Sequence, residues 1–307
     1  MAFTAQDVKT LREMTGVGMM DCKKALVASD GDMDKAVEWL REKGLAAAQK
    51  KAGRIAAEGM AYADVFDGVG VVVEVNAETD FVAKNDLFVD YTKKVAEVVA
   101  KENPENLEAL MACKYPGSDL TVEQMQQEKV LVIGENIKVR RFGRYDANLS
   151  VPYVHMGGRI GVLVNMTVSE GLENNETVHE LGKDLAMQVA AMRPGFCDKS
   201  DVDEATIAKE KEILTIQAKE DPKNAKKPEN IIEKMIMGRI GKYYEENCLM
   251  QQAFVKGDKI SVEKHVAEVA KSVGGSIKIN SFIRFEKGEG IEKKQEDFAA
   301  EIASMVK

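Results

Sequence analysis

The sequence predicts an α+β protein made of several parts. Three observations lead to this prediction: apolar residues at helical spacing near the N-terminus, a hairpin-plus-helix pattern that occurs twice in the middle, and a charged helical insertion in the second copy. With 307 residues and 45% hydrophobic content, the chain can bury more than one core. A disordered chain is therefore not expected.

The first part, residues 1–55, is expected to be a bundle of three short helices followed by a linker. Thr4 can cap the first helix while Asp7 reaches back to it, and Phe3 and Val8 occupy the positions of a hydrophobic staple. The buried stripe of this helix is predicted to be Val8, Leu11 and Met14.

Glycines are expected to set the ends of these helices. Gly16 and Gly18 interrupt the first helix, so that a second begins near Met19. A third helix is predicted to end at Gly44. Residues 46–52 then contain good helix formers with almost no apolar face, which favours an exposed linker.

The middle of the chain is expected to contain an internal repeat. Residues 60–65 and 69–76 flank a turn and predict a hairpin, covered by a helix that carries Phe88, Tyr91, Val95 and Val98. The same order returns in a hairpin around Gly157, followed by a helix with Val178, Leu181, Leu185, Val189 and Met192. An offset of 91 residues relates Gly70 to Gly161 and would align Val95 with Ala186 and Val98 with Val189.

The repeat divides the core into two expected subdomains. The first comprises residues 56–145, and the second comprises residues 146–195 together with 247–285. In the second, Ser261 can cap a helix, and the alternation of residues 276–285 predicts a final strand. Residues 286–307 are expected to form a C-terminal module with an amphipathic helix from about Glu296.

The insertion, residues 196–246, predicts an antiparallel helical hairpin joined by the segment 222–228. Its apolar seam is narrow, which suits a protruding coiled-coil arm better than an independent domain. The seam is predicted to consist of Ile207, Leu214, Ile231 and Met235. Such an arm is a candidate for contacts in a homodimer.

Composition narrows the classes of function. A net charge of −8 and a pI near 5.3 argue against direct nucleic-acid binding and favour a protein partner. No apolar run is long enough to span a bilayer and no signal-peptide layout is present, so a cytoplasmic location without membrane contact is expected. Four well-separated cysteines, expected to be reduced and mostly buried, suggest neither disulfides nor zinc: Cys22, Cys113, Cys197 and Cys248.

Motifs for catalysis are weak. The segment 287–290 has the glycines of a phosphate loop without its lysine and hydroxyl residues. The histidines His155, His179 and His265 share no metal-ligand spacing. We therefore predict no catalytic residue, metal or cofactor, and an enzyme is the least favoured class.

One loop combines expected exposure with hydrophobicity. Residues 78–85 lie between a strand and a helix, where backbone is normally at the surface. One interpretation is purely structural, with Thr79 or Asp80 capping the helix and Phe81 and Val82 tucked under the hairpin. The other is that the loop contacts a partner.

Four segments resemble motifs of the elongation factor Ts family, in the family's order. They are residues 15–26, 79–84, 155–163 and 282–293. The resemblance covers essentially the whole chain and is poorest over residues 199–252. It implies a ubiquitin-associated-like N-terminal domain, a core of two subdomains, a coiled-coil arm and a C-terminal module.

The resemblance also implies a function. The partner would be the GTPase elongation factor Tu, from which a family member releases GDP so that GTP can replace it. The residues implied to disturb the Mg²⁺ and phosphate site of the partner are Thr79, Asp80, Phe81 and Val82. His155 is implied as a further contact. Other candidate contacts with the partner are Met19 and Met20, since flexible methionines suit adaptable surfaces, together with Lys23, Phe298 and Ile302.

Alternatives remain for several of these residues. Met19 and Met20 are equally expected in the core of the bundle, His155 is also explained as a strand-end histidine, and the C-terminal helix could merely cover the sheet. The chain as a whole could instead be a peptide-binding adaptor or an assembly scaffold without exchange activity.

Overall fold

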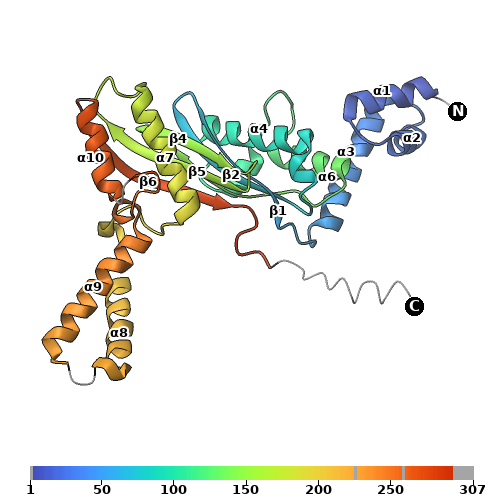
Figure 1. The fold of residues 1–307 in the computed structure, drawn as a ribbon. Helices are drawn as coiled ribbons and strands as arrows, with labels where there is room; N and C mark the ends of the chain where they lie inside the picture. The colour runs from blue at the N-terminus through green and yellow to red at the C-terminus, as the bar shows by residue number, and fades with distance from the viewer. Residues whose placement is uncertain (1–2, 225–226, 258–259, 293–307) are drawn as a thin grey trace.

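The computed structural model describes residues 3–224, 227–257 and 260–292. Figure 1 shows a helical bundle at one end, β-sheets covered by helices in the middle, and a helical hairpin that projects from the opposite end. The predicted mixture of helix and sheet is thus confirmed.

The N-terminal bundle consists of α1 (Ala5–Thr15), α2 (Met19–Ala28) and α3 (Met33–Lys51). Thr4 and Asp7 form the predicted capping box, and Gly16 ends α1 in the left-handed conformation with φ of 69°. The bundle core is formed by Val8, Leu11, Val17, Cys22, Ala25, Leu26, Ala36 and Leu40.

Three expectations about this bundle are wrong. Gly44 does not end the third helix, and residues 46–51 belong to α3 rather than to an exposed linker. Gly44 instead lies where α3 packs on α6 (Val122–Ile133), since a Cβ on it would be in van der Waals contact with the backbone of Gln127. Met14 is 62% exposed, whereas Val17 from the following turn is buried.

The described strands form two three-stranded antiparallel sheets. In the first, β2 (Val69–Ala77) lies between β1 (Glu58–Phe66) and β3 (Lys138–Tyr145). In the second, β5 (Ile160–Val168) lies between β4 (Leu149–His155) and β6 (Ile277–Glu286). Both sheets have a register shift at matching places, between Glu74 and Val75 in β2 and between Asn165 and Met166 in β5.

Each sheet is covered on its outer face by one long helix. α4 (Asp86–Glu102) packs on the first sheet, and α7 (Glu176–Met192) packs on the second. α5 (Leu107–Ala112) and α6 complete the first half of the core, which contains the first sheet; the second half contains the second sheet.

The repeat is real, but its predicted helix alignment is wrong by one residue. Strands β2 and β5 are related by the offset of 91, whereas the buried positions of α4 and α7 are related by an offset of 90. Val95 therefore corresponds to Leu185, and Val98 corresponds to Gln188. The reason is that the loop between β2 and α4 is one residue longer than the loop between β5 and α7.

The inner faces of the two sheets pack against each other at small residues. A Cβ on Gly70 would lie 2.5 Å from Cβ of Ser150, and one on Gly161 would lie 3.1 Å from the carbonyl group of Ala61. Glycine at both equivalent positions therefore lets the sheets approach. Between them lie the buried side chains Ala63, Val72 and Leu163.

A fully buried carboxylate, Glu74 of β2, lies at the junction of the two halves. Its oxygens accept hydrogen bonds from Arg140 (2.9 Å), Arg141 (2.5 Å) and the backbone N–H of Gly288 (2.8 Å). Burial by itself raises the pKa of Glu74, but these donors and the Asn76 amide together hold that pKa below its ordinary value. Gly288 of the segment 287–290 thus serves this junction, since a Cβ on it would collide with Ala57.

The projecting arm consists of α8 (Glu204–Glu220) and α9 (Glu229–Asn247). Leu214 lies in its seam as predicted, together with Ile236 and Ile240. The prediction that Ile231 lies in the seam is wrong, because this side chain is 39% exposed.

At the base of the arm, the chain returns to the second sheet through α10 (Val262–Ser272), which Ser261 caps as predicted. The buried amides of Gln188 and Gln252 are hydrogen bonded to each other there. All four cysteines are free, and Cys22, Cys197 and Cys248 are buried. Burial raises the pKa of Cys197 to about 12 and that of Cys248 to about 11.

We expect Glu74→Gln to lower the free energy of unfolding at about pH 7 by roughly 3 kcal/mol, since it removes one partner of a buried ion pair. Because the pKa of Glu74 is lowered in the folded protein, the stabilisation by its charge is present above the unfolded pKa of about 4.3 and is lost as the pH falls through the folded pKa. Urea unfolding across this range should show the difference between wild type and variant shrinking with acid. A difference independent of pH would contradict this account.

Candidate functional site

The candidate loop, residues 78–85, hereafter the Phe81 loop, connects the end of β2 to the start of α4. Asn85, rather than the predicted Thr79 or Asp80, caps α4, because its side chain accepts a hydrogen bond from the N–H of Leu87. Within the loop, Val82–Lys84 form a short 3-10 helix. This extra turn separates Thr79 and Asp80 from the start of α4.

Two neighbouring apolar residues of the loop have opposite environments. The side chain of Val82 is buried in the first core, whereas Phe81 is 81% exposed. The interpretation that both side chains are tucked under the hairpin is therefore right for Val82 and wrong for Phe81. An aromatic ring left in water on an ordered loop is a typical feature of a contact surface.

The base of the loop is fixed by the turn that follows α6. The Glu135 carboxylate accepts hydrogen bonds from the N–H of Thr79 (3.0 Å) and from its hydroxyl (2.7 Å). The Glu78 carboxylate accepts one from the N–H of Asn136 (2.6 Å) and pairs with Arg54 at 3.5 Å. Sequence reasoning missed Glu135, since nothing in the local pattern links it to a loop 56 residues away.

Asp80 lies at the edge of a charged cavity of about 650 Å³ between the two halves. It pairs with Lys84 at 3.4 Å. The same cavity is lined by Arg159 and Arg193, both of which pair with the Glu286 carboxylate, at 3.5 Å and 2.9 Å respectively. Neither arginine was predicted as a site residue, although Arg159 lies within one of the motif-like segments.

His155 lies close to this cavity, at the start of the turn between β4 and β5. Its Nδ1 atom is hydrogen bonded to the Tyr153 hydroxyl at 2.8 Å. The next residue, Met156, is exposed, and the carbonyl oxygen of Gly158 accepts a hydrogen bond from the N–H of Ala61 in β1. The structure thus brings the predicted Asp80 and the neighbourhood of His155 to one place on the surface.

The N-terminal candidates lie on another part of the molecule. Met19 and Met20 are 43% and 64% exposed, and Lys23 is exposed on the same helix. The alternative that Met19 and Met20 lie in the bundle core is therefore wrong. The bundle that carries them stands at the end of the molecule in Figure 1. Phe298 and Ile302 lie outside the described residues.

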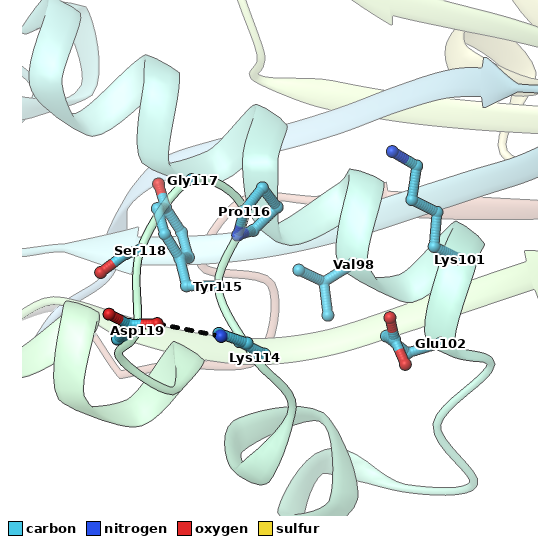
Figure 2. A pocket seen from close by; sticks show the side chains of 9 residues that line it. All are labelled: Val98, Lys101, Glu102, Lys114, Tyr115, Pro116, Gly117, Ser118 and Asp119. Carbon is cyan, nitrogen blue, oxygen red and sulfur yellow. Dashed lines mark ion pairs between the residues drawn. The ribbon is translucent and has the colours of Figure 1, made fainter.

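A second hollow, shown in Figure 2, has a volume of about 490 Å³ and involves none of the candidate residues. It lies at the C-terminal end of α4, where Lys101 and Glu102 face the turn that contains Pro116. Lys114 and Asp119 form an ion pair of 3.0 Å at its rim. The Phe81 loop instead precedes the N-terminal end of this helix.

Neither metal ligands nor membrane spans are found in the described part of the chain. No group of three or more His, Cys, Asp and Glu side chains there is arranged to hold a metal ion. Over residues 3–224, 227–257 and 260–292, each helix is too short or too polar to traverse a bilayer.

Comparison with known proteins gives a consistent result. A sequence model of the family described as Elongation factor TS matches residues 78–289. The chain is 50% identical over 306 residues to elongation factor Ts of Clostridium perfringens, with 98% of each chain covered. It is 47% identical to that of Syntrophotalea carbinolica over the full length of both, and 46% identical to that of Magnetococcus marinus, covering 100% of this chain and 99% of the relative.

The chain belongs to the elongation factor Ts family. The predicted resemblance is thereby confirmed, over nearly the full length of these relatives. The region matched by the family model includes the Phe81 loop, the residues that line the charged cavity beside Asp80 except Glu58, and Gly288 at the junction.

The different environments of Phe81 and Val82 predict different effects on stability. We expect Phe81→Ala to change the free energy of unfolding by less than about 0.5 kcal/mol, as is usual for exposed positions. Val82→Ala should lower it by about 1–2 kcal/mol, because it removes buried methyl groups. Urea unfolding of the two variants measures both values, and equal losses would show that Phe81 is packed in solution.

Proposed function

We propose that this chain is a guanine-nucleotide exchange factor for elongation factor Tu in the elongation step of cytosolic protein synthesis. It would bind the GTPase, promote release of GDP and leave when GTP enters, without making or breaking a covalent bond. The observation that carries the proposal is the exposed Phe81 on a loop whose base is held by hydrogen bonds. Family membership supports the identity of the partner.

The energetic requirement follows from linkage. A protein that prefers the nucleotide-free GTPase weakens nucleotide binding by the same factor by which nucleotide weakens its own binding. Typical couplings of about 1–3 kcal/mol change affinity only ~5- to 150-fold. An effective exchange factor must therefore act on one of the strong contacts of the nucleotide.

The bound magnesium ion of the GTPase is such a contact. It bridges phosphate oxygens of the nucleotide. A single unit-charge interaction at ~4 Å is of order 4 kcal/mol at an effective dielectric constant of ~20. Disturbing that interaction can change nucleotide affinity about a thousandfold.

The loop residues have distinct proposed roles. Phe81 would wedge between helices of the GTPase near the metal, which suits an exposed and rigidly mounted ring. Asp80 would compete for polar partners or repel the phosphate side. Thr79 and Val82 would hold the loop in shape, in line with the Glu135 bonds of the former and the burial of the latter.

Other surfaces would add affinity. We propose that Met19, Met20 and Lys23 contact the partner through the exposed face of α2, since flexible methionines adapt well to other surfaces. His155 is a proposed contact beside the charged cavity. Phe298 and Ile302, outside the described residues, remain proposed docking residues.

An adaptor or scaffold without exchange activity is the alternative. The exposed apolar side chains of the N-terminal bundle fit that function as well, among them Met14 and Met20. A pull-down distinguishes the two, because a scaffold should not prefer the nucleotide-free GTPase over its GDP-bound form.

The central prediction concerns Phe81. We expect the wild-type chain to accelerate release of fluorescent GDP from elongation factor Tu in stopped-flow measurements, and Phe81→Ala to reduce the stimulated rate about 10- to 100-fold, as for truncation of an interface hot spot. Val255→Ala, at another exposed apolar residue remote from the loop in sequence, is the control and should keep the wild-type rate. Full stimulation by Phe81→Ala would refute the wedge.

We also propose that the arm pairs with the arm of a second copy of this chain. Apolar side chains stand exposed on the outside of both arm helices, in addition to those that fill the seam. They are Ile213 and Ile216 on α8 and Ile231 and Met237 on α9. Arms in contact would remove this surface from water.

Sedimentation equilibrium tests the arm contact. Replacing both Ile213 and Ile216 by Glu should weaken self-association at least about tenfold, since each buried isoleucine contributes about 1.5–3 kcal/mol. Lys211→Glu changes the charge at an exposed site of the same helix that does not share the face of Ile213 and Ile216, and should leave the dimer intact. A wild-type chain that stays monomeric at all concentrations would exclude this contact.

A further inference from the structure

The Phe81 loop depends on a residue that lies far from it in the sequence. Both oxygens of the Glu135 carboxylate are engaged by Thr79, one by the backbone N–H at 3.0 Å and the other by the hydroxyl at 2.7 Å. The hydroxyl oxygen of Thr79 in turn lies 3.5 Å from the N–H of Val82, which donates to it. Glu135 therefore orients Thr79 on one side of Phe81, and Thr79 helps to orient Val82 on the other.

The position of Glu135 is itself well determined. α6 ends at Gly134, which takes the left-handed conformation with φ of 88° and turns the chain toward the loop. The next residue, Asn136, is buried, and it donates its backbone N–H to Glu78 and its side-chain amide to the carbonyl oxygen of Arg54. The turn is thus anchored on both sides of the carboxylate.

The end of α3 completes this base. Arg54 pairs with Glu78 at 3.5 Å, and Lys51 is close enough to both Glu78 and Glu135 to interact with their charges. Burial, followed by the charge of Arg54, lowers the pKa of Lys51, and the two carboxylates oppose this shift. Three chain segments therefore meet beneath the loop through charges and hydrogen bonds.

Such an anchor has a physical purpose. Moving an exposed phenyl ring out of water lowers the free energy of the protein, so a loosely held loop would let Phe81 fold back onto the nearby apolar core. Hydrogen bonds to a charged acceptor are among the stronger ones available to a backbone N–H. They keep the ring presented, which lowers the cost of ordering the loop when a partner binds.

We infer that Glu135 is a positioning residue for nucleotide exchange, which acts through Thr79 to fix the backbone from which Phe81 projects. This inference rests on the proposed function, because it assigns a role to Glu135 only if Phe81 promotes GDP release.

The first test is the rate of fluorescent GDP release from elongation factor Tu. Glu135→Ala should reduce the stimulated rate about tenfold, which corresponds to about 1.4 kcal/mol. Glu135→Gln keeps one acceptor oxygen and should recover part of the loss. Glu123→Ala removes an exposed carboxylate at the other end of α6 and should match wild type.

The second test is the double variant with Phe81→Ala. If Glu135 acts by presenting Phe81, Glu135→Ala should have little further effect once the ring is absent, so that the two effects are strongly non-additive. Full additivity would overturn the inference, because Glu135 would then act independently of the ring.

A local measurement separates this role from a general loss of fold. Amide hydrogen exchange should show that Glu135→Ala exposes the N–H of Thr79 while the amides of β2 and α4 stay protected. Unchanged protection of Thr79 would overturn the inference. If Phe81→Ala lowers the rate but Glu135→Ala does not, only this inference fails; if the wild-type chain does not accelerate release at all, the proposed function fails first.

Discussion

Burial of the Glu74 carboxylate is the constraint on which the arrangement of this molecule depends. A carboxylate without water is costly unless several donors surround it. Its donors come from β3, through Arg140 and Arg141, and from Gly288 beyond the end of the second sheet. The arginines and Asn76 belong to the same sheet as Glu74, so the set of donors is complete only when Gly288 is brought against that sheet, which ties the end of the second sheet to the first.

The candidate functional surface lies beside that junction. The segment that supplies Gly288 also supplies Glu286, which pairs with Arg159 and Arg193 in the cavity that Asp80 also lines. Phe81, whose ring is exposed, directly follows Asp80 in the chain. A frame made by both halves therefore carries a short, well-anchored loop, which suits the proposed exchange function.

The two halves show how one architecture takes on different tasks. Each has a hairpin, a covering helix and a third strand with a register shift at the matching position. The difference lies in the connections. Between the helix and the third strand, the first half has α5 and α6, whose final turn supports the Phe81 loop, whereas the second half has the projecting arm. The one additional loop residue of the first half lies in the segment that presents Phe81.

Local sequence by itself determined the capping box at Thr4, the two hairpins with their covering helices, and the helical hairpin of the arm, because turn chemistry and apolar period act over a few residues. It also marked the loop at residues 79–82 through its likeness to a family motif. Only the tertiary structure decided that α3 continues past Gly44, that Phe81 rather than Val82 is exposed, and that Glu135 supports Thr79. These features depend on contacts between segments far apart in the chain, which no local pattern encodes.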